Sequence, residues 1–561
     1  MKRGRTAGWL GLLLAAVFLL AGWLTLGQYG ITWDEPENFL AGELYWQFWR
    51  TGDARWLDFE GLKNQWAEAD QKPYFYVYTI GRQERYPPFA NTVSAVGAWA
   101  LHERAGWLDP TTAHHAAVPL FGALGVWVTF RFAWERRRRL SEALPAALML
   151  AAFPLYWAHA HNNIKDVPMA ALFAASLWAG WRAFGQAGRV SWKWALLAGG
   201  MAGLGLATKA NALFIAPILL LWLAWLYAPA LAGLRPKGGA VPWRSLAAAL
   251  LGMAAVAGVV LMVLWPYLWA DPLRRLYAVL RYFATAGRGA PVYFAGRLYT
   301  AGVDLPWYYA SAYLALTAPL GTLALGVLGL VRAGRSMLRR EDTAAPLWLI
   351  WFLVTLGRVS LPGMVVYDGL RQIMELLPAW CLLAGLGAGW CWEWLTRRLA
   401  VGRNVLAVLL LLALMLPQAL ALARLHPYEG AFFNALAGGV RGAASSFPLD
   451  YWGQSYKDGV EWLNAHAGPG AWVAVPIAGH LARFGLRGDV ALLITGERED
   501  VQGRAGEGYI MVLHHWAWVP SSSLAQWCLA AGEPAYVLER AGAGLLSIYR
   551  WPCGERTSHD E

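Results

Sequence analysis

The sequence is poor in charge. Charged residues make up 15% of its 561 residues, whereas a soluble protein carries roughly 25%. Hydrophobic residues make up 58%, and the 35 tryptophans are of a type that favours membrane interfaces. This composition excludes an ordinary soluble enzyme and predicts a polytopic membrane protein. The net charge of +11 lies in short loops between apolar stretches, so we expect no nucleic-acid partner.

Several motifs are also absent. The sequence has no glycine-rich phosphate loop, Walker motif, Cys/His metal framework or internal repeat, which argues against nucleotide-driven transport. Proton-coupled carriers are expected to have charged residues within their spans. Such residues are scarce here, which argues against a carrier of this kind. Only four cysteines are present. If the polar C-terminal part lies outside the cytoplasm, Cys528 and Cys553 can form a disulfide; two buried free thiols are the equal alternative.

Long apolar stretches dominate the first three quarters of the chain. Because about 17 to 25 apolar residues can cross a bilayer, we predict about eleven spans, near 8–27, 113–133, 143–160, 167–184, 192–208, 210–230, 245–269, 307–331, 345–362, 371–395 and 403–424. The first is longer than the apolar core of a signal peptide, about 7 to 15 residues, and no Ala-x-Ala site follows it. It is expected to remain as an anchor.

Basic residues predict the orientation in the plasma (inner) membrane. Lys2, Arg3 and Arg5 place the N-terminus in the cytoplasm, where loops are rich in Lys and Arg. Each later cytoplasmic loop is then basic, including 136–139, 182–193, 235–244, 332–340 and 397–403. Counting the apolar segment 88–103 as a span would reverse this pattern. We therefore interpret it as an amphipathic helix on the outer surface.

The pattern changes from about residue 425. A helix is expected at 457–467 and another at Ser523–Ala531, with short strands at 471–477, 490–494, 509–513 and 535–538. Residues 545–551 can pair after a Gly-Ala-Gly turn, and the polar tail from residue 554 is expected to be disordered. The chain thus divides into a membrane domain, 1–424, and a small extracytoplasmic α/β domain, 425–561.

Two acidic sites lie on the predicted outer face. Asp34 and Glu35 follow the first span, and they are either a solvated acid pair at a helix end or a general base for an acceptor hydroxyl. Lys165 and Asp166 follow a later span, and they either cap the next helix or hold an acceptor, a metal or an anionic group. His159 and nearby His161 make a divalent metal possible, but a His-x-His pair without a third ligand assigns none.

Outer-face cations run against the positive-inside tendency. They are Lys209, Arg274, Arg275, Arg281, Arg288, Arg297 and Arg371. Binding a phosphate head group would explain them, since Arg offers a bidentate fork and Lys a point charge. The alternative for 274–281 is an amphipathic surface helix that touches lipid phosphates. That alternative is weaker for Lys209, which lies between two apolar helices.

These motifs resemble a known superfamily. Thr32-Trp-Asp-Glu-Pro36 resembles the Asp-Glu motif of GT-C glycosyltransferases of the protein O-mannosyltransferase type, a group that includes the bacterial aminoarabinose transferases of lipid A. Arg85-Tyr-Pro-Pro-Phe89 is similar to the family's His-Pro-Pro-Leu motif, with Tyr86 in place of His. The second acidic loop is matched by 161–168, and later family segments by 305–309, 367–371 and 450–456.

The resemblance implies a GT-C fold, mainly α-helical with outer juxtamembrane helices. It also implies transfer of a sugar from a polyprenyl-phosphate donor to a hydroxyl of a protein, lipid or glycan on the outer face, in a single inverting displacement. By analogy Asp34 is the base and Asp166 the second acidic site; the analogy gives Glu35 no equally clear role, and we interpret it as a helper at the catalytic site. Donor phosphate binding is assigned to Lys209, Arg371, Lys165 and Arg85, and the substrate pocket to Tyr86 and His161.

Two other functions explain part of the pattern. A transporter or lipid flippase without chemistry explains the spans but not the acidic sites gathered on one face. A membrane anchor for an outer binding domain explains 425–561, but about eleven spans are excessive for an anchor.

Overall fold

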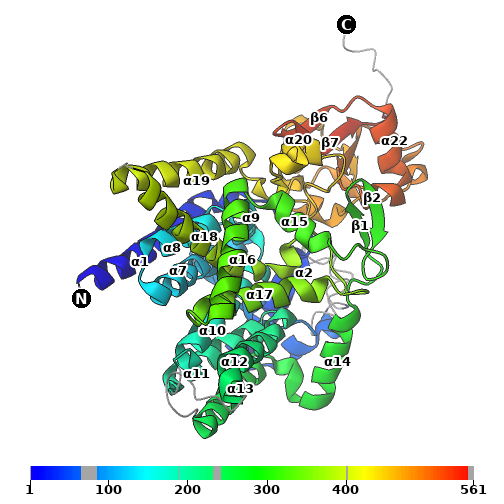
Figure 1. Ribbon diagram of the computed structural model, residues 1–561. Helices are drawn as coiled ribbons and strands as arrows, with labels where there is room; N and C mark the ends of the chain where they lie inside the picture. The colour runs from blue at the N-terminus through cyan, green and yellow to red at the C-terminus, as the bar shows by residue number, and fades with distance from the viewer. Residues whose placement is uncertain are drawn as a thin grey trace.

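The computed structural model describes residues 2–62, 64, 85–186, 189–231, 242–399 and 402–553, and most of them are helical (Figure 1). Every predicted span contains helix. The bundle helices are α1 (Lys2–Thr25), α7 (Val118–Arg137), α8 (Leu140–Ala151), α9 (Pro154–Asn162), α10 (Asp166–Phe184), α11 (Trp192–Leu206), α12 (Ile215–Leu231), α13 (Trp243–Leu264), α15 (Tyr309–Thr317), α16 (Leu320–Arg339), α17 (Ala344–Val359), α18 (Leu376–Arg398) and α19 (Arg403–Leu425).

Not every bundle helix is long enough to cross a membrane alone. Among the described residues, five helices are sufficiently long and apolar, and the pair α8 and α9, bent by 55°, makes a possible sixth. Proline explains the breaks: Pro154 begins α9 after the bend, and Pro319 separates α15 from α16, since proline cannot continue a helix from the preceding residue. The number of about eleven spans stays a prediction.

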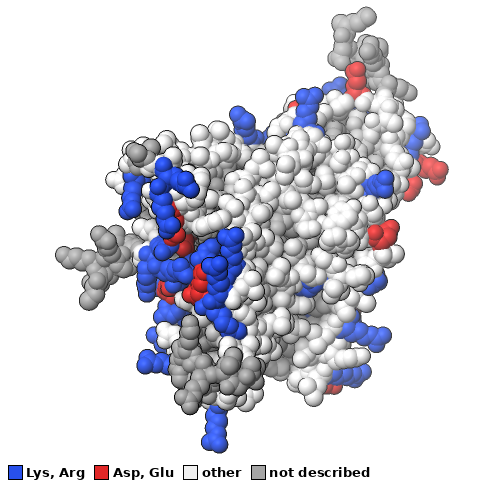
Figure 2. Space-filling model, viewed as in Figure 1, with Lys and Arg blue, Asp and Glu red and all other residues white. Residues whose placement is uncertain are grey.

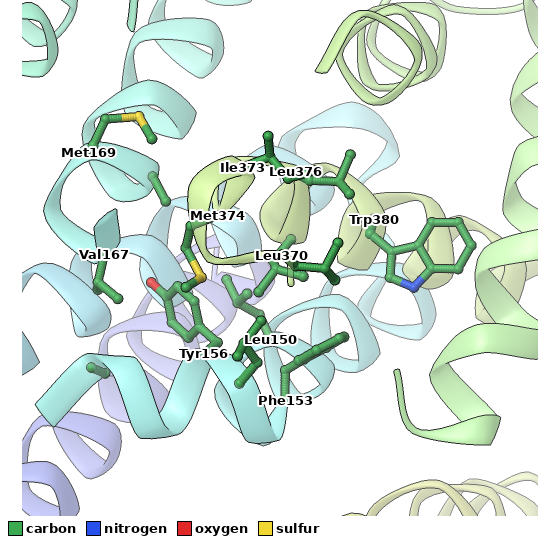
Figure 3. Packing of buried hydrophobic residues seen from close by; sticks show 14 of the residues in the cluster. Leu150, Phe153, Tyr156, Val167, Met169, Leu370, Ile373, Met374, Leu376 and Trp380 are labelled. Atoms are coloured by element: carbon green, nitrogen blue, oxygen red, sulfur yellow. The ribbon is translucent and has the colours of Figure 1, made fainter. Parts of the chain in front are cut away.

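The apolar core lies where α8, α9, α10 and the start of α18 meet. Figure 3 shows Leu150, Phe153 and Tyr156 from α8 and α9 facing Met374 and Leu370, with Val167 of α10 beside them. All of these side chains are buried. Because interiors are packed as densely as organic crystals, this core holds the N-terminus of α10 and the segment before α18 in fixed positions.

Glycines allow the closest helix contact, between α16 and α18. A Cβ at Gly329 would overlap the backbone carbonyl of Leu383, and one at Gly387 would overlap that of Leu325. Small residues that let backbones approach are typical of membrane helix interfaces. The two helices are therefore joined through their backbones rather than through large side chains.

Shorter helices flank the bundle: α2 (Glu35–Thr51), α5 (Phe89–Ala98), α6 (Pro110–His115) and α14 (Pro272–Thr285). The predicted surface helix at 88–103 is α5 with its π-helical extension Trp99–Arg104. Its polar side packs inward, with Asn91 and Ser94 each 1% exposed, and Ser94 donates a hydrogen bond to the His114 carbonyl at 2.7 Å. Its apolar side, with Val93 and Val96, stays partly exposed, where a bilayer would cover it.

The C-terminal part contains α21 (Tyr456–His466), α22 (Ser523–Ala531) and a five-stranded sheet. The strand order is β4 (Ala491–Leu493), β3 (Trp472–Ala474), β5 (Gly508–Leu513), β7 (Ala543–Arg550) and β6 (Tyr536–Arg540). β3 is parallel to β4 and β5, whereas β7 is antiparallel to β5 and β6. The β6–β7 hairpin turns at Ala541 and Gly542, both with positive φ as in a type I′ turn.

The structure resolves the cysteine alternatives. Cys528 of α22 and Cys553 after β7 form a disulfide, with their Cα atoms 5.3 Å apart. Cys381 and Cys391 of α18 are free. The predicted strands and both helices of this part are confirmed. The predicted disordered tail from residue 554 lies outside the described residues, and the boundary at residue 425 stays a prediction.

Charge is distributed unevenly over the molecule. Figure 2 shows Lys and Arg side chains gathered, with Asp and Glu among them, on the side where the chain begins. Ion pairs join two of the predicted cytoplasmic loops there: Arg136 binds Glu142 at 2.6 Å within its own loop and Asp342 at 2.7 Å in the other, where Arg332 binds Glu341 at 2.6 Å. The loops predicted to share one side of the membrane thus meet at one end of the bundle.

Candidate functional site

Asp34 and Glu35 begin α2, and their side chains point to different surroundings. Pro36 favours the first turn of the helix. Glu35 is 1% exposed; its Oε2 accepts the Thr32 backbone N–H at 2.8 Å, and its Oε1 lies 2.9 Å from His115 Nε2. Asp34 makes no capping hydrogen bond, and its side chain is 53% exposed. Only Asp34 is therefore open to a substrate.

Asp166 begins α10 and is held on both carboxylate oxygens. Oδ1 accepts from Lys209 Nζ at 2.5 Å, and Oδ2 accepts from Asn163 Nδ2 at 2.9 Å. Asn163 in turn accepts the Asp166 backbone N–H at 2.8 Å, so this first N–H group of the helix has a partner. The side chain is 3% exposed. Asp166 is thus a fixed and largely satisfied charge, unlike Asp34.

Arg371 joins the two acidic sites. Its Nη1 lies 3.2 Å from Asp34 Oδ2 and 3.7 Å from Asp166 Oδ2, and its Nη2 donates to Asp368 at 2.6 Å. The guanidinium also stacks on Trp452, 4.2 Å from the ring centroid. Asp34 and Asp166 are far apart in the sequence, and this single buried cation brings them to one place.

Asp368 is a site residue that the sequence analysis missed as such. It adopts a left-handed backbone, φ 54°, and the following Gly369 does the same at φ 62°. The Gly369 N–H donates to the Tyr309 hydroxyl at 2.9 Å, which fixes the turn. Burial raises the pKa of the Asp368 carboxyl, and Arg371 opposes that rise. Its position three residues before Arg371 is the sequence feature that could have indicated an ion pair between the two.

A hydrogen-bonded chain leads from Asp166 to the C-terminal part. Asn163 lies 3.1 Å from His159 Nδ1, and His159 Nε2 lies 2.7 Å from the Tyr451 hydroxyl. His161, which was predicted to line the pocket, is instead fully buried. Its Nε2 lies 2.9 Å from Thr25, and its ring stacks on Tyr29. Residues two apart on a helix face different sides, so the two histidines cannot share one role.

Lys165, which precedes Asp166 in the chain, contacts Tyr86. The Lys165 ammonium lies 4.5 Å from the centroid of the Tyr86 ring, and the Tyr86 hydroxyl shares a hydrogen bond with Tyr282 of α14 at 2.9 Å. Burial raises the pKa of Tyr86 well above its usual value, so the phenol is neutral. Arg85 is exposed to solvent. The predicted Tyr86 and Lys165 thus contact each other.

The C-terminal part supports the loop that carries Asp34. The Trp33 N–H donates to the Trp452 carbonyl at 2.9 Å, and His480 Nε2 lies 3.1 Å from the Trp33 carbonyl. A Cβ at Gly30 would meet the Gln454 backbone oxygen, so this loop lies directly against 450–456. The site is therefore built from both ends of the chain.

Metal ligands are not gathered here. Over the described ranges, no group of three or more His, Cys, Asp or Glu side chains is arranged to hold an ion. The three aspartates around Arg371 are compensated by that cation and by Lys209. We assign no metal to the site.

Comparisons with known proteins agree with the motif resemblance. Residues 111–265 match the family model of the dolichyl-phosphate-mannose-protein mannosyltransferases. This range includes Lys165, Asp166 and Lys209. No curated protein sequence matches the chain.

Two solved structures share the fold. One is ArnT from Cupriavidus metallidurans, solved with undecaprenyl phosphate: it is 15% identical, with 96% of this chain and 98% of that chain covered, at a TM-score of 0.50. The other is the oligosaccharyltransferase AglB from Archaeoglobus fulgidus, solved with an inhibitory peptide and a dolichol-phosphate. It is 12% identical, with 90% of this chain and 69% of that chain covered, at a TM-score of 0.50. The resemblance to the GT-C superfamily is confirmed, and the fold is GT-C.

Proposed function

We propose that this chain, which has the GT-C glycosyltransferase fold, moves a sugar from a polyprenyl-phosphate donor to an acceptor hydroxyl outside the cytoplasm. The observation that carries the proposal is the pairing of an exposed carboxylate, Asp34, with a cluster of buried Asp166 and Arg371 and half-buried Lys209. An exposed base beside a charged cluster that the fold holds in place suits a reaction that takes a proton from a substrate hydroxyl.

In the proposed reaction, Asp34 removes the proton of the acceptor hydroxyl. The acceptor oxygen forms a bond to the anomeric carbon while the bond from that carbon to the donor phosphate oxygen breaks. The electron pair of the broken bond leaves with the polyprenyl phosphate, and the anomeric configuration inverts. Cations of the site stabilise the negative charge that the phosphate gains.

The neighbours of Asp34 fit this role. Arg371 lies 3.2 Å from the Asp34 carboxylate and holds it beside the cluster. Asp166 is bound by Lys209 and Asn163, so its proposed role is to keep these groups in place beside the acceptor. Glu35 helps indirectly, because it holds the Thr32 backbone and so shapes the loop before Asp34.

The proposal includes an orientation of the chain in the membrane. The N-terminus and the ion-paired basic loops lie in the cytoplasm, and the site and residues 425–561 lie outside. A disulfide between Cys528 and Cys553 is consistent with an oxidising compartment. Because Trp452 and Tyr451 contact the site, the membrane domain 1–424 and the outer domain 425–561 are proposed to act together rather than as an anchor and a separate binding module.

The decisive experiment is sugar transfer by purified protein in nanodiscs, with lipids extracted from its native membrane as donors and mass spectrometry of the products. We expect Asp34→Asn to lower the rate by about 100- to 10,000-fold, the scale of a general base. The matched control is Asp489→Asn, which removes an exposed carboxylate paired with Arg487 and should leave the rate unchanged. Normal transfer by Asp34→Asn would refute its role as the base.

The competing function is a transporter or flippase. It predicts no transfer by the wild-type protein, together with movement of donor lipid between the leaflets of a vesicle. Among the described residues, the gathering of Asp34, Asp166 and Asp368 around one arginine favours chemistry, because a lipid pathway needs no exposed base.

A further inference from the structure

The cations of the site differ in how far their charge is already compensated. Arg371 contacts three carboxylates, those of Asp34, Asp166 and Asp368. Lys209 contacts Asp166 at 2.5 Å. A phosphate approaching either cation would have to compete with carboxylates that the fold holds in place. Neither residue therefore offers an uncompensated positive charge.

Lys165 is different. Within the described residues its ammonium has no carboxylate at ion-pair distance, and it lies 4.5 Å from the centroid of the Tyr86 ring. The side chain is half-buried. Contact with an aromatic face stabilises a cation without using its N–H donors, so all three remain available for oxygen acceptors.

The surroundings hold Lys165 and the ring that its ammonium contacts. The Lys165 backbone N–H donates to Asn163 Oδ1 at 3.3 Å, the same oxygen that accepts the Asp166 N–H. The Tyr86 ring is held by Tyr282. A fixed, half-buried ammonium interacts more strongly with an anion than one in free solution, because the local dielectric constant is lower.

We propose that Lys165 binds the phosphate of the donor, whereas Arg371 and Lys209 are positioning residues that hold Asp34 and Asp166. The inference rests on the proposed function and names the residue that meets the leaving group. Tyr86, which stands where the family motif has His, provides the neutral aromatic face on which this lysine lies.

The titration of Lys165 supports this assignment. Burial lowers the pKa of the Lys165 ammonium to about 8, against the opposing attraction of Asp34 and Glu37 from α2 and of Asp166. Lys209 disfavours the charged form as well, and the facing Tyr86 is neutral. The ammonium is charged below pH 8 and loses its proton above it. Phosphate binding should therefore weaken as the pH rises through about 8, and Lys165→Arg should remove this dependence, since Arg stays charged.

The test compares binding of two probes, undecaprenyl phosphate and undecaprenol, to the full-length protein in nanodiscs. We expect Lys165→Met to reduce the preference for the phosphate by about 10- to 100-fold, the range for a lost hydrogen bond to a charged group, and to leave undecaprenol binding unchanged. The matched control is Lys193→Met, which removes a lysine with a similar aromatic contact, 5.5 Å from the Trp194 ring, and should leave both affinities unchanged.

The outcomes separate the two proposals. Full phosphate preference in a folded Lys165→Met variant, or its retention by wild-type protein above pH 9, overturns the role of Lys165 and leaves the transferase in place. A wild-type protein that binds both probes equally overturns the proposed function, and this inference with it. Retained binding by Lys165→Arg at high pH supports a role for charge rather than for folding.

Discussion

Adjacent residues can carry unrelated tasks, and Asp34 and Glu35 show why. Asp34 precedes the first turn of α2 and faces outward, whereas the next side chain turns about 100° around the helix axis and faces His115. The buried Glu35 accepts the Thr32 N–H. The pair therefore comprises one carboxylate open to substrate and one that is part of the interior.

Replacing Glu35 should therefore affect stability more than chemistry. Glu35→Ala leaves the Thr32 N–H and the His115 ring without their partner, a loss of about 1–3 kcal/mol for buried polar groups. We expect a lower Tm in detergent, with transfer per folded molecule within a few-fold of wild type. Asp34→Asn should show the reverse, a normal Tm and little transfer. A stable Glu35→Ala variant as inactive as Asp34→Asn would make Glu35 part of the chemistry.

The sequence predicted that the main charged residues of the site lie together, but it did not predict the residues that pack around them. Asp34, Asp166, Lys209 and Arg371 meet as predicted from their shared face of the membrane. His161 lies elsewhere because the register of α9, which the sequence did not specify, turns it toward α1. The contacts of Tyr451 and Trp452 come from tertiary packing, which no local pattern encodes.

At the scale of helices, the packing of α16 against α18 depends on glycine. The approach of α16 to α18 requires glycine at position 329, since a Cβ there would overlap the Leu383 carbonyl. Gly334 lies on the same helix with nothing within 4 Å of its Cβ position. The two glycines differ only in what surrounds them, so they form a natural pair for comparison.

Substitution of this pair should separate packing from helix propensity. Gly329→Val forces the helices apart, and overpacking of this kind costs about 1–3 kcal/mol or more. We expect a marked fall in Tm and in folded yield for Gly329→Val, and near wild-type values for Gly334→Val. Thermal unfolding monitored by circular dichroism measures both. Equal Tm values would show that α16 and α18 are less tightly joined than their backbones indicate.

Helices were easier to predict than their breaks. Hydropathy located every bundle helix because each must bury or expose a long apolar surface to lipid. It could not show that Pro154 and Pro319 divide two of the predicted spans, since a short interruption barely changes a windowed average. The C-terminal strands were found from their own turns and β-branched residues, but their order depends on contacts between distant segments.

Across the whole molecule, the two ends have opposite character. One end gathers the basic loops and their ion pairs (Figure 2). The other carries the sheet, its disulfide and the small hairpin of β1 (Pro291–Phe294) and β2 (Arg297–Thr300), whose turn contacts the C-terminal part through the Gly296 N–H and the Ser446 carbonyl at 3.0 Å. Asp34 and Arg371 lie toward this second end. Under the proposed function, a donor made of a lipid tail and a polar sugar meets the acceptor at this end of the molecule.

Cysteine labelling tests the sidedness on which the proposed reaction depends. In a Cys391→Ser background, Cys381 is buried and the other two cysteines are joined in a disulfide. Arg297→Cys and Arg339→Cys each place one thiol at an exposed position, on β2 and at the end of α16. A membrane-impermeant maleimide added to intact cells should label position 297 and not 339, because the basic loops are predicted to face the cytoplasm. After permeabilisation both should react, which shows that both thiols are accessible. Labelling of position 339 from outside would place the basic loops outside the cytoplasm and the candidate site within it, where an outer-face acceptor could not reach Asp34.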